Sequence, residues 1–253
     1  MNGSAAVAKL ALPYSRLAAE YDATIGLPFF RQTRNSFERI VRRYGIKFGS
    51  AADIGCGTGL FARHLTTSHG IPVFAVDLSA PMLRIAARNC CGTNVVLLKQ
   101  DIRRLHLPRK VDLITANFDT LNHMLSAHDL RQTLRRIFEN LKPGGHFIFD
   151  VVTNCYALGR RSYVMRFRRR HRSVTQTVRV DPIKGLISIF VSIRFPNMWR
   201  PIIERHCERA YTPAELGRAL HLTGFIVRGV HDAATLVETT RCPPRIIVVA
   251  SKS

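Results

Sequence analysis

The sequence contains few acidic residues, a single tryptophan and no long apolar run. Its longest apolar stretches, such as Ile246 to Ala250, have the length of a strand, so we expect no membrane span. The alanine-rich start before Pro13 is broken by Lys9, and it lacks both a basic lead and a clear cleavage site, which is untypical of a signal peptide. These absences favour a cytoplasmic protein.

The cysteines include no C-x-x-C pair and show no ligand-like spacing with histidine, so we expect no zinc site and no other metal. The adjacent Cys90 and Cys91 are expected to be one buried and one half-exposed thiol in a reducing compartment. The six cysteines are Cys56, Cys90, Cys91, Cys155, Cys207 and Cys242.

Basic residues outnumber acidic ones by 38 to 17, which gives a formal charge of +21, and only 7 of the 38 are lysine. A field of this sign attracts polyanions such as nucleic acid, membrane surfaces or acidic metabolites. Residues 151–210 hold 13 basic against 3 acidic residues, or +10 of the total. We favour solubility and composition over nucleic-acid binding as the reason for the arginine excess, and keep nucleic acid as an alternative.

The length of 253 residues suits one α/β domain with an appendage. Strand-like and helix-like segments alternate up to residue 152, which predicts a parallel sheet with helices on both faces. The expected strands are 49–54, 72–77, 95–99, 111–117 and 145–152, and the expected helices are 60–68, 79–88 with Ser79 as N-cap, and 128–141.

The pattern changes after residue 160. Segments 174–180 and 186–195 are rich in β-branched residues and predict an antiparallel hairpin. Thr212 to Glu215 form a capping box, and Gly224 is a natural end for the helix that follows it. Segments 225–230 and 246–250 supply the last two expected strands of the core.

Residues 51–61 read AADIGCGTGLF, with an acid two positions before the first of three alternate glycines. A glycine-rich turn between strand and helix lets a ligand approach the backbone and points free N–H groups at it. The dinucleotide fingerprint would need a third glycine at Leu60, and Asp53 would repel a pyrophosphate. The turn therefore favours a ligand that carries positive charge.

These residues resemble the class I S-adenosylmethionine-dependent methyltransferases, whose cofactor carries a sulfonium and an ammonium group. In the resemblance, the acid at 77 takes the ribose hydroxyls, and Asp101 with the next amide reads the adenine edge. The matching motifs, in the family's order, are 53–59 (DIGCGTG), 76–83 (VDLSAPML), 100–102 (QDI) and 141–145 (LKPGG).

The resemblance implies a Rossmann-like sheet, S-adenosylmethionine as cofactor and S-adenosylhomocysteine as product. Residues 14–22 resemble a helix that covers the cofactor, with Tyr14 and Tyr21 on one helix face, although both could be packing residues. The implied cofactor-binding residues are Tyr14, Tyr21, Asp53, Gly55, Gly57, Gly59, Asp77, Leu78, Met82, Asp101, Ile102, Asn117 and Phe118.

The acceptor side is expected at 117–123, which lacks the N-P-P-Y type tetrapeptide associated with amino groups of bases or protein glutamine. The spacing of Phe118 and His123 resembles small-molecule N-methyltransferases, including sugar N,N-dimethyltransferases and glycine/sarcosine-type enzymes. His123 is the candidate catalytic base for an amine, with a helix cap or a carbonyl partner as the alternative. Asp119 is either an N-cap or a catalytic acid.

The expected division is a lid over 1–45, a cofactor-binding core over 46–155, a β insertion that shapes the acceptor pocket over 156–210, and a last helix and two strands over 211–253. We expect methyl transfer to a small-molecule acceptor, such as an amine nitrogen. The alternatives are an RNA or protein methyltransferase that docks through the basic insertion, and a non-catalytic cofactor-binding protein. Neither the acceptor nor the oligomeric state follows from the sequence.

Overall fold

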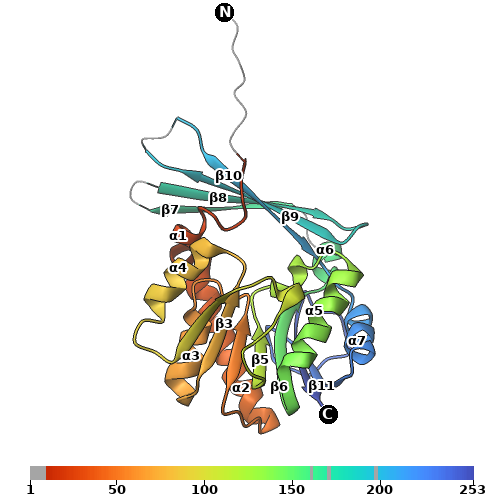
Figure 1. Cartoon of the computed structure of the whole chain (residues 1–253). Coiled ribbons are helices and arrows are strands. Elements are labelled where there is room, and N and C mark those ends of the chain that lie inside the picture. Colours follow the sequence, from red (N-terminus) through yellow and green to blue (C-terminus); the bar gives the residue numbers. More distant parts are fainter. Residues whose placement is uncertain (1–9, 160–161, 170–171, 197–198) are drawn as a thin grey trace, which may run out of the picture.

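The computed structural model describes residues 10–159, 162–169, 172–196 and 199–253, whose strands form two sheets, the smaller of which lies across one end of the larger (Figure 1). The expectations for residues 1–9, and for Arg160, Arg161 and Arg170 of the basic segment, lie outside the described residues.

The larger sheet has seven strands in the order β11-β12-β6-β5-β2-β3-β4. The five strands from β4 to β6 run parallel, whereas β12 is antiparallel to both β6 and β11. The prediction of a parallel sheet with two late strands is thus confirmed. The strands are β2 (Ala51–Ile54), β3 (Val73–Asp77), β4 (Val95–Lys99), β5 (Val111–Ala116), β6 (Leu141–Val152), β11 (Phe225–Asp232) and β12 (Arg245–Lys252).

Helices cover both faces of this sheet, as predicted. On one face α3 (Leu60–His69) and α4 (Ala80–Asn89) pack against strands β2 to β4. On the same face α2 (Leu27–Tyr44) packs beside α3, and its Tyr44 contacts His231 of β11. On the other face lie α5 (Ala127–Asn140) and α7 (Pro213–Leu222). Among the described residues, none of the helices has both the length and the apolar character that a membrane crossing requires.

Local hydrogen bonds set two of the predicted helix starts. The Ser79 hydroxyl accepts from the Met82 amide at the start of α4. Thr212 and Glu215 form both halves of the capping box at the start of α7. Because these partners are at most three residues apart, sequence alone could place them.

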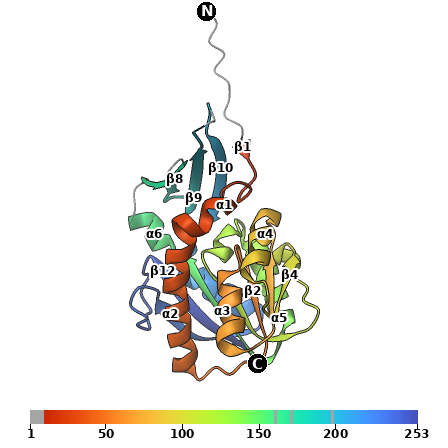
Figure 2. The same ribbon diagram turned by 90° about the vertical axis from the view of Figure 1, so that its left-hand side faces the viewer.

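The smaller sheet has five strands in the order β1-β10-β9-β8-β7. The predicted hairpin is confirmed as β8 (Arg172–Asp181) and β9 (Leu186–Arg194), paired antiparallel. Outside the predicted hairpin stand β7 (Tyr163–Arg169), β10 (Ile202–Arg209) and the short β1 (Leu10–Ala11), which pairs in parallel with β10. Figures 1 and 2 show this sheet lying across one end of the larger sheet.

The lid differs from the expected helix. Tyr14 lies in a turn with φ of 57°, and α1 (Ala18–Tyr21) starts only at Ala18, before a π-helical turn (Asp22–Gly26) leads into α2. The expectation that Tyr14 and Tyr21 share a helix face is therefore wrong. Their rings nevertheless meet edge to face, with centroids 6.2 Å apart. Leu17 buries its side chain against Val174 and Val191 of the smaller sheet, so this sheet and not a helix determines the path of the turn.

Candidate active site

A cavity of about 660 Å³ lies where the carboxyl ends of β2 to β5 face β10 and the turn over residues 12–17, called the lid turn below. Strands that run in parallel bring the residues after their carboxyl ends to one edge, which is where open α/β sheets form their binding sites. Of the predicted site residues, Gly59 alone does not line this cavity. The lining residues are Tyr14, Tyr21, Asp53, Gly55, Gly57, Asp77, Leu78, Met82, Asp101, Ile102, Asn117, Phe118 and His123.

The three alternate glycines all have left-handed backbone, with φ of 68°, 53° and 79° at Gly55, Gly57 and Gly59. Their surroundings differ. A Cβ on Gly55 would lie 2.3 Å from Thr120 Oγ1, and one on Gly59 would lie 2.9 Å from Cys90 Sγ. A Cβ on Gly57 would meet no atom within 4 Å. Gly55 and Gly59 thus allow the turn to pack, whereas Gly57 leaves its space to the cavity.

Asp77, at the end of β3, holds the glycine turn. Its Oδ2 accepts from the Gly57 amide at 2.8 Å, and its Oδ1 accepts from the Ser79 amide at 2.7 Å. The amides of Cys56 and Gly59 also donate to backbone carbonyls. The expectation that the turn points these N–H groups at a ligand is therefore wrong for Cys56, Gly57 and Gly59. The turn presents a carboxylate edge, which suits hydroxyl or cationic groups.

Asp53, at the end of β2, is a buried acid on the cavity wall. It is 2% exposed, and its Oδ1 accepts from Thr115 Oγ1 at 2.9 Å. Burial raises the pKa of Asp53 to about 7, against the effect of the Thr115 hydrogen bond. A positive charge in the cavity would favour the ionised form of this side chain.

The polar rim of the cavity comes from the turn after β4. Asp101 caps the short helix Ile102–Arg104 by accepting from the Arg103 amide at 2.9 Å. The Arg103 guanidinium also binds this carboxylate and is the main cause of its lowered pKa. Leu78, which is 63% exposed, forms an apolar part of the same rim, whereas Met82 is buried beneath it.

After β5 the backbone bends sharply into the cavity. Phe118 and Asp119 have φ of 56° and 61°, a conformation that is uncommon outside glycine and costs about 1–3 kcal/mol where the surroundings impose it. Nδ2 of Asn117 is buried without a hydrogen-bond partner among the described residues. Asp119 occupies the N-cap position of the next turn but makes no side-chain cap, because its carboxylate pairs with Arg245 at 2.6 Å.

His123 is fixed by two hydrogen bonds. Its Nδ1 lies 3.3 Å from the Cys207 carbonyl, which can only accept, so Nδ1 carries the proton. Nε2 is then the acceptor for the Tyr14 hydroxyl at 3.2 Å. Burial, and then repulsion by His206, lower the pKa of His123, which keeps the ring neutral. His123 thus has the carbonyl partner named as an alternative to a catalytic role, and it also lies on the cavity wall.

Strand β10 adds two buried residues that the sequence reasoning did not single out. Glu204 accepts from the amides of Tyr14, Arg16 and Leu17, and from His206 Nε2 at 3.2 Å. His206 lines the cavity beneath the Tyr14 ring, at a centroid distance of 4.4 Å. Positions 204, 206 and 208 share one side of the strand, so this buried polar row faces the lid.

A second polar cluster lies around Arg245, near Phe118 and Asp119. The guanidinium pairs with Asp119 and Asp150. Burial raises the pKa of both Asp150 and Glu208, and the negative charge of Asp119 adds to each effect. Because Arg245 already binds Asp119, a catalytic-acid role for that residue has no support in this geometry.

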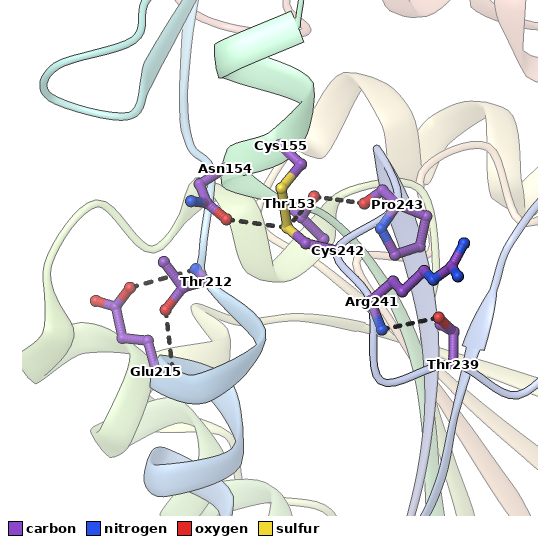
Figure 3. The surroundings of a disulfide bond; sticks show 9 residues. All are labelled: Thr153, Asn154, Cys155, Thr212, Glu215, Thr239, Arg241, Cys242 and Pro243. Carbon is purple, nitrogen blue, oxygen red and sulfur yellow. Dashed lines mark hydrogen bonds between the residues drawn. A yellow bond between two sulfur atoms is a disulfide. The ribbon is translucent and has the colours of Figure 1, made fainter.

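A disulfide between Cys155 and Cys242 fastens this region. It joins the short helix α6 (Asn154–Gly159) to the loop before β12, across a sequence separation of 87 (Figure 3). Thr153 Oγ1 donates to the Pro243 carbonyl beside it. The pairing was not expected, because we took the cysteines to lie in a reducing compartment. Of the adjacent pair, Cys90 is buried as expected and Cys91 is exposed.

Comparison with known proteins agrees with this arrangement. Residues 51–145 match the family described as "Methyltransferase domain". A dTDP-3-amino-3,6-dideoxy-alpha-D-glucopyranose N,N-dimethyltransferase from Streptomyces fradiae is 34% identical over 111 residues, which are 44% of this chain and 42% of that protein. The chain spans about half the length of the first curated relatives it matches.

Two solved structures share nearly the whole fold. An S-adenosylmethionine-dependent methyltransferase from Clostridium acetobutylicum has a TM-score of 0.80 at 24% identity, with 95% of this chain and 99% of that chain covered. A sugar N-methyltransferase from Streptoalloteichus sp. has a TM-score of 0.77 at 19% identity, with 100% and 98% covered. Residues 51–145 thus match a methyltransferase domain, and the whole chain shares the fold of these S-adenosylmethionine-dependent methyltransferases.

The cavity fits S-adenosylmethionine, the cofactor named for the Clostridium acetobutylicum structure. Asp53 is a buried acid on the cavity wall that a cationic ligand would ionise, Asp77 is the acid expected at the ribose hydroxyls, and the open space over Gly57 admits a ligand beside the turn. Lys99 to Arg103 line another part of the same cavity, and Asp101 and Ile102 among them are the residues predicted to bind the adenine. The role of each residue in binding the cofactor remains a prediction.

Proposed function

We propose that this protein transfers a methyl group from S-adenosylmethionine to the nitrogen of a small-molecule amine. The observation that carries the proposal is the Tyr14–His123 hydrogen bond, which lies in the wall of the cavity that also holds Asp53 and Gly57. When bound, the cofactor supplies an electrophilic methyl group for in-line displacement, so the protein needs chiefly to position a nitrogen lone pair and to exclude water.

Tyr14 and His123 are placed to remove a proton from an incoming ammonium. The Tyr14 oxygen donates its hydrogen to His123 Nε2 and keeps lone pairs that can accept an N–H from the substrate. A proton that leaves the amine can pass to Tyr14 while the hydroxyl proton passes to the imidazole. Because its pKa is lowered, His123 is neutral and ready to accept at neutral pH.

The shape of the acceptor side favours a small molecule. The lid turn, Phe118 and β10 cover the part of the cavity next to His123. Several arginines of the insertion pack on its own aromatic rings: Arg172 lies over Phe195, and Arg179 lies over Phe190. Arg172 also pairs with Glu20 of the lid, so this charge serves an internal contact. An amino sugar, as named for the Streptomyces fradiae relative, is the first acceptor class to test.

The direct test incubates the protein and S-adenosylmethionine with a panel of nucleotide-linked amino sugars, simple amino acids and their hydroxyl analogues. We expect mass increases of about 14 or 28 Da, for one or two methyl groups, on amino sugars only. Methylation of hydroxyl analogues alone, or of none of the panel while the cofactor still binds, would contradict the proposal.

The proposed base has its own test. His123→Asn is expected to lower turnover about 100-fold, with a larger loss at lower pH, while cofactor affinity and folding stay intact. If His123 only orients the acceptor, KM should rise with little change in the pH profile. Tyr14→Phe is the matched variant, because it removes the hydroxyl and leaves the ring on His206.

The RNA alternative predicts a different result. If the insertion docks RNA, several phosphate contacts should give tight, structure-selective binding to tRNA or rRNA at physiological salt. We expect only weak, non-specific RNA binding that disappears near that ionic strength. A filter-binding salt titration distinguishes the two. Cofactor binding without turnover on any acceptor would instead indicate a non-catalytic protein.

A further inference from the structure

One cluster of titratable side chains lies outside the cavity, between helices α2 and α3. Glu38 comes from α2, and both histidines, His64 and His69, come from α3. Nε2 of His64 lies 2.7 Å from Glu38 Oε1, and Nε2 of His69 lies 2.9 Å from the same oxygen. The three ligand atoms lie within 4.8 Å of one another.

We propose that Glu38, His64 and His69 form a binding site for a divalent transition-metal ion, with Zn²⁺ as the best fit. Two imidazole nitrogens and one carboxylate oxygen are common zinc ligands, and the remaining coordination position would be left to water. Metal–ligand distances of about 2.1 Å place tetrahedral ligands roughly 3.3 Å apart, so each Nε2 has to move only about half an ångström from Oε1.

The surroundings are those of a metal site rather than of an open surface pair. The side chains of His64 and His69 are 11% and 23% exposed. Ser68 Oγ lies 3.0 Å from His64 Nδ1, the position from which a second partner orients a metal-bound imidazole. Phe37 and Phe48 pack against the His69 ring.

Two nearby charges act in opposite directions on a bound cation. The Glu38 carboxylate, to which both Nε2 atoms point, would attract it. Arg34, whose guanidinium lies over the Phe30 ring that contacts His64, would oppose it. Removing Arg34 should therefore tighten metal binding.

A metal here would connect the lid to the cofactor turn. α2 continues from the lid, and α3 begins directly after Gly59. Phe30 and Phe61 line the cavity on one side and contact the His64 ring on the other, with centroids 6.1 and 6.0 Å away. The ion would therefore clamp the two helices that form this wall.

The test uses untagged, chelator-treated full-length protein. Isothermal titration with Zn²⁺ should give one site per chain, and zinc should raise the melting temperature in a way that EDTA reverses. His64→Gln and His69→Gln should each weaken binding at least about tenfold, and Arg34→Gln should strengthen it. His221→Gln, which changes an exposed histidine on α7, is the matched control and should bind as the wild type does.

Cobalt provides an independent readout. Co²⁺ in the proposed site should show visible d–d bands without thiolate charge transfer, because no cysteine takes part. The metal-free variants should bind S-adenosylhomocysteine with an affinity within about twofold of that of the wild type, which would show that they fold. Because this control measures no turnover, the metal test can fail without affecting the proposed function. Three results would overturn the proposal: no saturable zinc binding, zinc binding by both histidine variants as tight as that of the wild type, or a thiolate spectrum.

Discussion

Replacing Glu204 by glutamine tests how the smaller sheet holds the lid. The side chain is fully buried, and its two oxygens accept hydrogen bonds from different donors. Oε1 accepts from Ser15 Oγ and from the amides of Arg16 and Leu17, whereas Oε2 accepts from the Tyr14 amide and from His206. A glutamine keeps one oxygen but turns an NH₂ group toward the Tyr14 amide, where donor meets donor.

The size of the local destabilisation follows from the number of hydrogen bonds that Glu204 accepts. A hydrogen bond to a charged acceptor contributes about 1.5–3 kcal/mol, and the change removes one and weakens the others. We expect a local loss of about 2–3 kcal/mol, which corresponds to a rise of roughly 30- to 150-fold in the opening of the turn. His206 can accept from the new amide after a change of tautomer, so the loss should stay local to the turn.

Hydrogen exchange measured by mass spectrometry on the segment 12–17 is the suitable assay, because it reports local opening directly. Glu215→Gln, in the capping box of α7, is the control and should leave this segment protected. If exchange in 12–17 is unchanged in folded Glu204→Gln protein, the carboxylate does not hold the lid.

The same contact predicts a pH dependence. Burial alone would raise the pKa of Glu204, but hydrogen bonds from His206, Arg16 and Leu17 lower it below its usual value. A group with a lowered folded-state pKa stabilises the structure above its ordinary pKa, and the stabilisation is lost as the pH falls through the folded value. Protection of 12–17 should therefore be complete at neutral pH and decline below about pH 4.5.

Three further changes probe the rest of the site. Gly57→Val and Asp77→Asn should each weaken S-adenosylmethionine binding at least about tenfold by calorimetry, and unchanged affinity in both would contradict the placement of the cofactor. Affinity should rise with pH through about 7, because a cationic ligand favours ionised Asp53, and a pH-independent affinity would refute this charge role. Removing the Cys155–Cys242 bridge by Cys155→Ser should lower the free energy of unfolding by up to about 4 kcal/mol, because the bridge closes a long loop. Urea melts of the variant and the wild type measure this loss, and equal stability of the two would mean that the bridge is dispensable.

The core could be predicted because its signals are local. The strand 95–99 has the predicted bounds, and the caps at Ser79 and Thr212 bond to amides three residues away. The glycine turn was recognisable because three left-handed positions in sequence admit little besides glycine. These features need no information about distant parts of the chain.

The turn over residues 14–17 and the β10 side of the cavity depend on distant contacts. Residues 14–17 have a helical sequence pattern, but Glu204, 187 to 190 residues away, accepts from the amides of Tyr14, Arg16 and Leu17 and holds a turn. Strand β10 reads E-R-H-C-E-R over 204–209, a pattern without an apolar face, so nothing marked its charged side chains as buried. The proposed metal site was missed for the same reason, because Glu38 lies on α2 whereas both histidines lie on α3.

The parallel pairing of β1 with β10 has a consequence for protein engineering. Residues 10–17 and the insertion form one mechanical unit, tied by two residue pairs between β1 and β10 and by the Glu204 carboxylate, although they lie far apart in the sequence. A chimera that receives a foreign insertion over 156–210 but keeps its own first turn would separate that carboxylate from its amides. Transplanting both segments together should keep these contacts, so the exchangeable module of this protein is discontinuous.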